Sequence, residues 1–327
     1  MNRQVVVRMV ATLAVGMFGM LGDLAGQVSG QHARRVAATP SRVPRTANRH
    51  PNFEGTWAYG TATPLERPAQ FSDKPFFVSD AEAEQFLKQS QSDRRAVQAS
   101  RLGVPEFVEP DWPFVTIAGR KPTSVIFEPS DGRIPYIAPD MQQRPIEERL
   151  DKPEDVPLSE RCLRALAGPP ILPNVGLLYV QIFQTSDDVV LSQEDLHDAR
   201  IVPLDGRSHV SGQIRTWLGD SRGRWDGDTL IVDTTNFRDQ LHQRGPSYRF
   251  DRNLRVVERL TLVSSDTLWY EFTVEDPTLF TRPWSGRFPM RKTGEPIFEV
   301  ACHEGNYAMF NMLRGARVQE GVGATSR

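Results

Sequence analysis

The chain has 327 residues, with 39 basic against 41 acidic side chains and a formal net charge of −2. This balance provides no broad basic surface, so we expect neither nucleic acid nor an anionic membrane surface as a partner. The length fits one large β-rich domain preceded by an N-terminal arm, and the expected partner is a small molecule or another protein.

The N-terminus has the pattern of a secretory signal peptide over residues 1–26. Arg3 and Arg8 precede an uncharged apolar run over residues 9–21, and small residues follow at Ala25 and Gly26. The run is shorter than the roughly 20 residues of a stable membrane span. We therefore expect a periplasmic or secreted mature protein without an integral membrane segment.

The remaining chain divides by composition. Residues 27–51 are rich in Arg, Ala, Thr, Ser and Pro and predict a disordered arm. A single β-rich domain is expected over 52–320, with a loop-rich half over 52–175 and an antiparallel meander over 176–301. Residues 321–327 are expected to form a flexible tail.

One helix is expected in the N-terminal half of the domain. Ser79 and Glu82 have the spacing of a capping box before a run of helix-forming residues, which predicts a helix over 78–100. The proline-rich segment 103–173 predicts long loops with one strand and a short helix near 159–167.

Short β-branched and aromatic runs alternate with tight turns from residue 176 onward. This pattern is typical of an antiparallel meander that hides its edges by closing into a barrel or folding into a sandwich. The fold class predicted is therefore mainly β. Asp226 and Gly227 lie between two such runs and predict a type I′ hairpin turn.

The triplet Gly219-Asp220-Ser221, followed by Asp239 and His242, superficially resembles the GDSL-type serine hydrolases. In those enzymes the serine follows a strand near the start of an α/β domain, whereas here the whole set lies among β hairpins. A loop built of turn residues is the preferred interpretation.

The chain has two cysteines, Cys162 and Cys302. In an oxidising compartment they predict one disulfide, with two free buried thiols as the alternative.

Strand periodicity places one carboxylate, Glu258, on the same face as Val256, Leu260 and Leu262. If that face is the interior, burial raises the pKa of Glu258 unless a cation pairs with it. The catalytic interpretation makes Glu258 an acid, and the structural alternative pairs it with a buried arginine such as Arg200 or Arg224.

Two histidines are further candidates. His197 and Glu194 could form a polar patch in or at the mouth of a barrel, or His197 could simply bind a backbone carbonyl. His303 and Glu304 directly follow Cys302, which places them on a loop that the disulfide would pin. These four side chains could also hold zinc or another divalent ion, although their spacing is not diagnostic. The sequence leaves the cofactor open.

Five of the tryptophans could pack in the core or line a pocket for a planar or sugar ligand: Trp57, Trp217, Trp225, Trp269 and Trp284. The residues expected to bind a ligand are Trp217, Trp225, Arg224 and Tyr270.

Two function classes fit these residues. In the first, the protein binds or carries a small molecule, oriented by Glu258 and arginines. In the second, it is an acid–base hydrolase, lyase or isomerase acting on a carbohydrate or aromatic compound. His197 or His303 would then be the base, Glu258 or Glu304 the acid, and Arg200 would stabilise an anion. A third possibility is a β surface that recruits an envelope protein.

Long motifs over residues 53–317 carry a family resemblance. They include HDARIVPLDGR, WLGDSRGRWDGDTLIVDTTNF, FTVEDPTLFTRPW, ACHEGNYAMFNMLRGAR, TATPLERP and PLSERC. On these the chain resembles a family of exported bacterial proteins of unknown function, of the kind found in Acidobacteria and Proteobacteria. The resemblance implies export and a single domain. The GTW start before a late meander is also similar to calycin barrels such as lipocalins.

Overall fold

The computed structural model describes residues 43–102, 112–138, 151–156, 158, 161–163, 168–173, 178–194, 199–238 and 251–325. Side chains are described throughout these ranges except within 93–102 and 322–325. All of these residues belong to the unit Pro40–Arg327. The expected signal peptide, His197, Asp239 and His242 lie outside the described residues.

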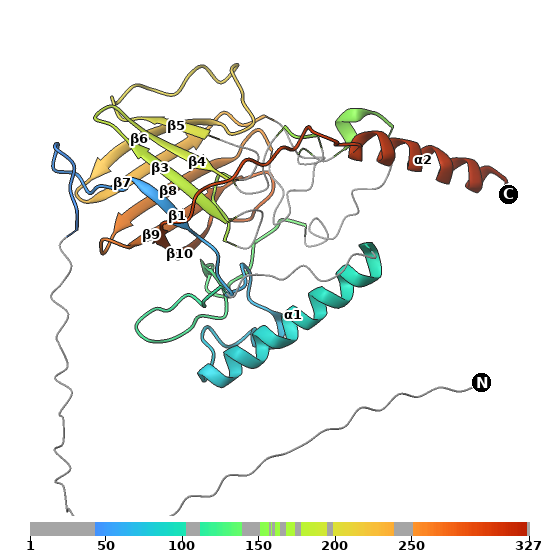
Figure 1. The fold of residues 1–327 in the computed structure, drawn as a ribbon, viewed down its shortest axis with the longest axis horizontal. Helices are drawn as coiled ribbons and strands as arrows, with labels where there is room; N and C mark the ends of the chain where they lie inside the picture. The colour runs from blue at the N-terminus through green and yellow to red at the C-terminus, as the bar shows by residue number, and fades with distance from the viewer. Residues whose placement is uncertain are drawn as a thin grey trace, which may run out of the picture. The chain divides into compact units, whose positions relative to one another are not determined.

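Ten antiparallel strands form one sheet that curves into a nearly closed barrel (Figure 1). The strands are β1 (Gly55–Ala58), β2 (Ile126–Glu128), β3 (Tyr179–Gln184), β4 (Asp188–Gln193), β5 (Ala199–Pro203), β6 (Asp220–Asp226), β7 (Thr229–Thr235), β8 (Arg255–Leu262), β9 (Thr267–Glu275) and β10 (Trp284–Thr293). Their order is β5-β4-β3-β1-β10-β9-β8-β7-β6, and β2 pairs with β10 beside this path. The predicted mainly β fold class and antiparallel pairing are therefore confirmed.

The barrel interior is a packed aromatic and aliphatic core. Along β9 every second residue is buried, as expected where successive side chains of a strand point to opposite faces. The largest side chains that are almost fully buried include Trp57, Tyr59, Tyr270, Phe272, Trp284 and Phe288. These rings pack together in one hydrophobic core.

The barrel closes where β5 meets β6, and there the two strands pack without a hydrogen-bonded ladder. Gly223 of β6 allows this approach, since a Cβ at that position would lie 2.6 Å from Leu204 Cδ2 and 2.8 Å from Val202 Cγ1. Any larger residue would push the two edges apart. The absence of a side chain thus determines how tightly this seam closes.

The predicted N-terminal helix is confirmed as α1 (Asp80–Leu102). Its first turn has the predicted cap, because the Glu82 N–H donates to Ser79 Oγ at 3.2 Å while the Glu82 carboxylate accepts from the Val78 N–H at 2.6 Å. A small aromatic cluster packs around the start of the helix and contains Phe71, Phe77, Phe86 and Phe114. The described loops contain the short 3-10 helices η1 (Ala69–Phe71) and η3 (Pro153–Asp155).

The chain ends in a second helix, α2 (Ala308–Thr325), where the sequence analysis expected domain residues and a flexible tail. The segment is rich in the helix formers Ala, Met, Leu, Arg, Gln and Glu. Asn306 precedes it, and its side-chain oxygen accepts the Ala308 N–H at 2.9 Å. This contact satisfies a backbone donor at the helix start, as an N-cap does.

The predicted type I′ turn between β6 and β7 is wrong in its details. The two loop residues are Gly227 and Asp228, because Asp226 pairs with Thr229 in the ladder. Gly227 has φ +59°, whereas Asp228 is not among the described residues with positive φ. Glycine with positive φ at the first loop position, followed by a residue with negative φ, fits a type II′ turn.

The end of the segment expected to be a disordered arm is bound to the barrel. Arg45 pairs with Pro51 in an isolated β-bridge, and its guanidinium donates to both carboxylate oxygens of Asp228 at 2.8 and 2.6 Å. The hydrogen bonds from Arg45 lower the pKa of Asp228. Composition alone missed this anchoring, since it depends on a residue 183 positions away.

Cys162 and Cys302 form the predicted disulfide, with their Cα atoms 5.8 Å apart. The Asn306 side-chain amide donates to the Cys162 sulfur at 2.9 Å. Within the described part of the chain, no helix has the length and apolar character needed to cross a membrane.

Candidate functional site

The predicted residues Arg200, Glu258 and Tyr270 meet inside the barrel. The Arg200 guanidinium donates to both carboxylate oxygens of Glu258, at 2.6 and 2.7 Å, and the Tyr270 hydroxyl donates to the same carboxylate at 2.6 Å. The Tyr270 oxygen in turn accepts the Ile171 N–H at 2.8 Å. Three strands, β5, β8 and β9, and one loop are tied together by these bonds.

This network is closed to solvent. The side chains of Arg200 and Glu258 are 3% and 0% exposed. Burial, together with the negative charge of Glu258, holds the pKa of Tyr270 well above its usual range. Each charge is paired and the Tyr270 hydroxyl both donates and accepts, as expected of a structural network. The geometry therefore matches the structural alternative for Glu258, and its catalytic role stays a prediction.

Three other predicted residues that the structure describes, Glu194, His303 and Glu304, do not join this network. His303 and Glu304 are exposed, in the segment between β10 and α2. Glu194 is buried, and its carboxylate accepts the Phe298 N–H at 3.1 Å. Among the described residues, no group of three His, Cys, Asp or Glu side chains is placed to hold a metal ion.

Ser221, from the hydrolase-like triplet, is buried, and its hydroxyl shares a hydrogen bond with the Thr234 hydroxyl at 2.9 Å. Trp217 lies on a shallow surface pocket of about 350 Å³ at the β5–β6 seam. The Arg238 guanidinium lies 4.7 Å from the centre of its ring. Arg224 is exposed on β6. The residues expected to bind a ligand therefore do not form one site.

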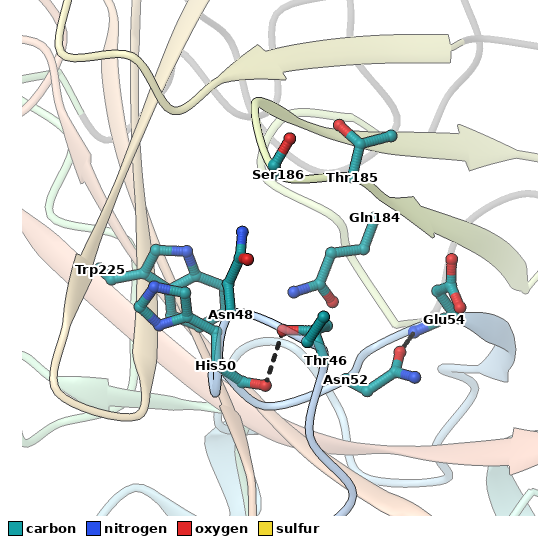
Figure 2. A pocket seen from close by; sticks show the side chains of 10 residues that line it. Thr46, Asn48, His50, Asn52, Glu54, Gln184, Thr185, Ser186 and Trp225 are labelled. Atoms are coloured by element: carbon teal, nitrogen blue, oxygen red, sulfur yellow. Dashed lines mark hydrogen bonds between the residues drawn. The ribbon is translucent and has the colours of Figure 1, made fainter.

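Trp225 lies at a different pocket, with a volume of about 330 Å³ (Figure 2). Three chain segments meet there: the anchored stretch before β1, the turn between β3 and β4, and the end of β6. The lining residues are Thr46, Ala47, Asn48, His50, Asn52, Glu54, Gln184, Thr185, Ser186 and Trp225. The volume is near the lower end of the range for small-molecule sites.

One wall of this pocket is aromatic. The His50 ring stacks on Trp225, with ring centres 4.4 Å apart and planes within 7° (Figure 2). Phe53 packs against Trp225 from the core, at 5.4 Å. Because the Trp225 ring is supported from the core and covered by His50, a ligand would meet a rigid surface at low entropic cost.

The opposite walls are polar, and several of their groups are already fixed. Gln184 accepts the Phe53 N–H at 2.9 Å and donates to the Pro51 carbonyl at 3.1 Å, which holds the anchored segment to β3. The Asn52 side chain accepts the Glu54 N–H at 2.9 Å (Figure 2). These bonds orient the backbone around the pocket before any ligand arrives.

Other polar groups keep their hydrogen-bonding capacity. Within the described part of the chain, the side chains of Asn48, Glu54 and Ser186 make no hydrogen bond. Together they offer an amide, a carboxylate and a hydroxyl. The pocket thus combines an aromatic wall with donors and acceptors that remain available.

Sequence reasoning predicted Trp225 but missed its neighbours on the N-terminal side. Asn48, His50 and Glu54 lie in or directly after the stretch interpreted as an arm. A usable signal was present, because His50, Pro51, Asn52 and Phe53 lead directly into the first strand and combine turn residues with aromatic rings.

Comparison of the chain with family models, curated proteins and solved structures found no match. The resemblance to a family of exported proteins therefore stays an expectation drawn from the sequence.

Proposed function

We propose that this protein is an exported binding protein that holds a small, uncharged, hydroxyl-rich molecule in the Trp225 pocket. The observation that carries the proposal is the pairing of the His50–Trp225 stack with the available polar groups of Asn48, Glu54 and Ser186. Sugar-like molecules present both an apolar face and a ring of hydroxyl groups, so they match such a surface.

The charge of the pocket supports an uncharged ligand. No lysine or arginine is among its described lining residues, and Glu54 contributes a carboxylate. An anionic ligand would meet this negative charge without a compensating cation, whereas hydroxyl groups can donate to it. We therefore expect neutral sugars to bind in preference to acidic ones.

Export is part of the same proposal. The signal-like segment at residues 1–26 supports it, and so does the Cys162–Cys302 disulfide, since such bonds persist in oxidising compartments such as the periplasm.

The test is a titration of the purified protein with neutral mono- and disaccharides. Binding is measured by calorimetry and by saturation-transfer NMR. We expect saturable binding of at least one neutral sugar, and weaker binding of the corresponding uronic acid. His50→Ala should weaken binding roughly tenfold, because it removes the exposed face of the aromatic wall.

Trp225→Phe tests the same wall with less disturbance, and Trp217→Phe is its matched control, because Trp217 lies on another pocket. Equal losses in the two phenylalanine variants would contradict the assignment of the pocket. The proposal itself fails if no neutral sugar binds saturably at millimolar concentration.

A further inference from the structure

A second hollow lies on the outer surface of the barrel, over β7, β8, β9 and β10. Its volume is about 310 Å³. Seven residues line it: Ile117, Thr229, Arg259, Thr261, Trp269, Glu271 and Arg287. None of them lines the Trp225 pocket, so this hollow, which we call the arginine groove, is a separate feature.

Three charged residues cross the arginine groove in one row. Arg259 of β8 is the ladder partner of Glu271 on β9, and Glu271 is the ladder partner of Arg287 on β10. A carboxylate flanked by two guanidinium groups leaves one positive charge in excess. Directly opposed side chains on a sheet lie close enough to pair, so this row has the positions for two ion pairs.

The ion pairs are nevertheless not formed. Within the described part of the chain, Glu271 makes no ion pair with Arg259 or with Arg287. A nearby position on the same face behaves differently: Arg255 of β8 contacts Asp233 at 2.9 Å and Glu275 at 3.3 Å. The sheet geometry therefore permits such pairs, and around the arginine groove the charged groups are held apart.

Arg287 has a buried hydrogen-bond donor that is not paired within the described part of the chain. Its Nε atom is buried and has no hydrogen-bond partner among the residues that the structure describes, while its guanidinium lies over the Phe127 ring at 5.0 Å. A buried donor without an acceptor costs free energy, and in native proteins it commonly marks the place of a bound water or ion. An oxyanion in the arginine groove would balance the excess positive charge of Arg259 and Arg287.

Trp269 provides an apolar surface for a second part of the ligand, beside the oxyanion. It is half-buried on β9, two residues from Glu271 and on the same face of the sheet. The hydroxyls of Thr229 and Thr261, beside it, share a hydrogen bond at 2.8 Å and so partly satisfy each other. The indole therefore offers an apolar surface next to the two arginines.

We propose that the arginine groove binds an oxyanion, a carboxylate or a phosphate, attached to a flat ring. The guanidinium groups of Arg259 and Arg287 hold the oxyanion, and Trp269 contacts the ring. Guanidinium groups suit this task because their planar forks match the geometry of carboxylates and phosphates.

The test is calorimetric titration of the full mature chain with four probes: benzoate, phenyl phosphate, acetate and benzyl alcohol. We expect the first two to bind saturably, with affinity that falls as salt is added. Acetate lacks the ring and benzyl alcohol lacks the charge, so each should bind at least tenfold more weakly. The stronger of benzoate and phenyl phosphate identifies the oxyanion.

Three variants are expected to change ligand affinity in different ways. Arg259→Gln, at an exposed position, should weaken benzoate or phenyl phosphate binding roughly tenfold, and Glu271→Gln should strengthen it, because the competing carboxylate is removed. Arg255→Gln is the matched control and should leave it unchanged. Absence of saturable binding overturns the proposal, as do equal losses in Arg259→Gln and Arg255→Gln. Because Trp225→Phe affects only the other pocket, failure here is distinguishable from failure of the proposed function.

Discussion

At the scale of single residues, the buried carboxylate of Glu258 is paired with a guanidinium and a hydroxyl inside the barrel. Glu258 is 0% exposed, and its two oxygens are bound by Arg200 and Tyr270. A buried ion pair contributes little net stability compared with well-packed apolar residues, yet the loss of one partner leaves an uncompensated charge in a medium of low polarity. The network therefore fixes how β5, β8 and β9 pack, and each member depends on the others.

Glu258→Gln should lower the free energy of unfolding by about 3–5 kcal/mol, because Arg200 then stays buried without its counter-charge. Urea unfolding followed by circular dichroism measures this loss. The double variant Arg200→Met, Glu258→Leu should lose less than the single variant, since both charges are removed together. A double variant that is less stable than Glu258→Gln would contradict this account.

Residues differ in how far the sequence reveals their role. Period-two alternation placed Glu258 on one face with Val256, Leu260 and Leu262 and predicted its burial if that face is the interior. Arg200 was one of two arginines proposed as its partner. Arg200 is buried in β5, whereas its neighbours Ala199 and Ile201 are exposed, as alternation along a strand requires. His50 and Asn48 could not be found in this way, because no local period exists before the first strand.

At the scale of elements, most strands after residue 176 were predictable, because each is a short β-branched or aromatic run bounded by turn residues. β6 is the exception: Asp220 and Ser221 begin this strand, whereas the sequence predicted a loop there, because DSRGRWD is largely polar. The strand order was not predictable. β1 lies between β3 and β10, and its partners are more than 120 residues away in the sequence. No local pattern encodes such a pairing. Helix α2 was missed for a different reason, since Gly315, Gly321 and Gly323 interrupt its helix-forming residues.

The β5–β6 seam makes a prediction at this scale. Gly223→Ala should lower the free energy of unfolding by about 1–3 kcal/mol, because the added Cβ overlaps Leu204 and Val202. Gly212→Ala is the control: Gly212 has no atom within 4 Å of a built Cβ and no positive φ, so its stability should hardly change. Thermal unfolding of the two variants compares them. Equal effects would show that the seam is not closely packed.

At the scale of the whole molecule, the disulfide joins positions that are 140 residues apart in the sequence. It connects the loop containing Cys162 to the segment that follows the last strand. Linking such distant positions removes many conformations from the unfolded chain, which is the main source of stabilisation by long-range disulfides in the chain-entropy account.

The variant Cys162→Ser, Cys302→Ser should therefore lose about 4–5 kcal/mol of unfolding free energy relative to the oxidised protein. Denaturant unfolding with and without a reducing agent measures it. Reduced wild-type protein should match the double serine variant, which is the internal control. A loss below about 1 kcal/mol would mean that the unfolded chain is already compact around these positions.

The position of β1 in the sheet also determines when the barrel can assemble during synthesis. Residues 55–58 pair with 179–182 on one side and with 291–293 on the other, so the first strand has a free edge until nearly the whole chain has been made. Synthesis from the N-terminus produces β1 long before β10. Assembly of the barrel, and of the Trp225 pocket directly before β1, must therefore await the last strand. Until then, one edge of β1 in the nascent chain stays unpaired.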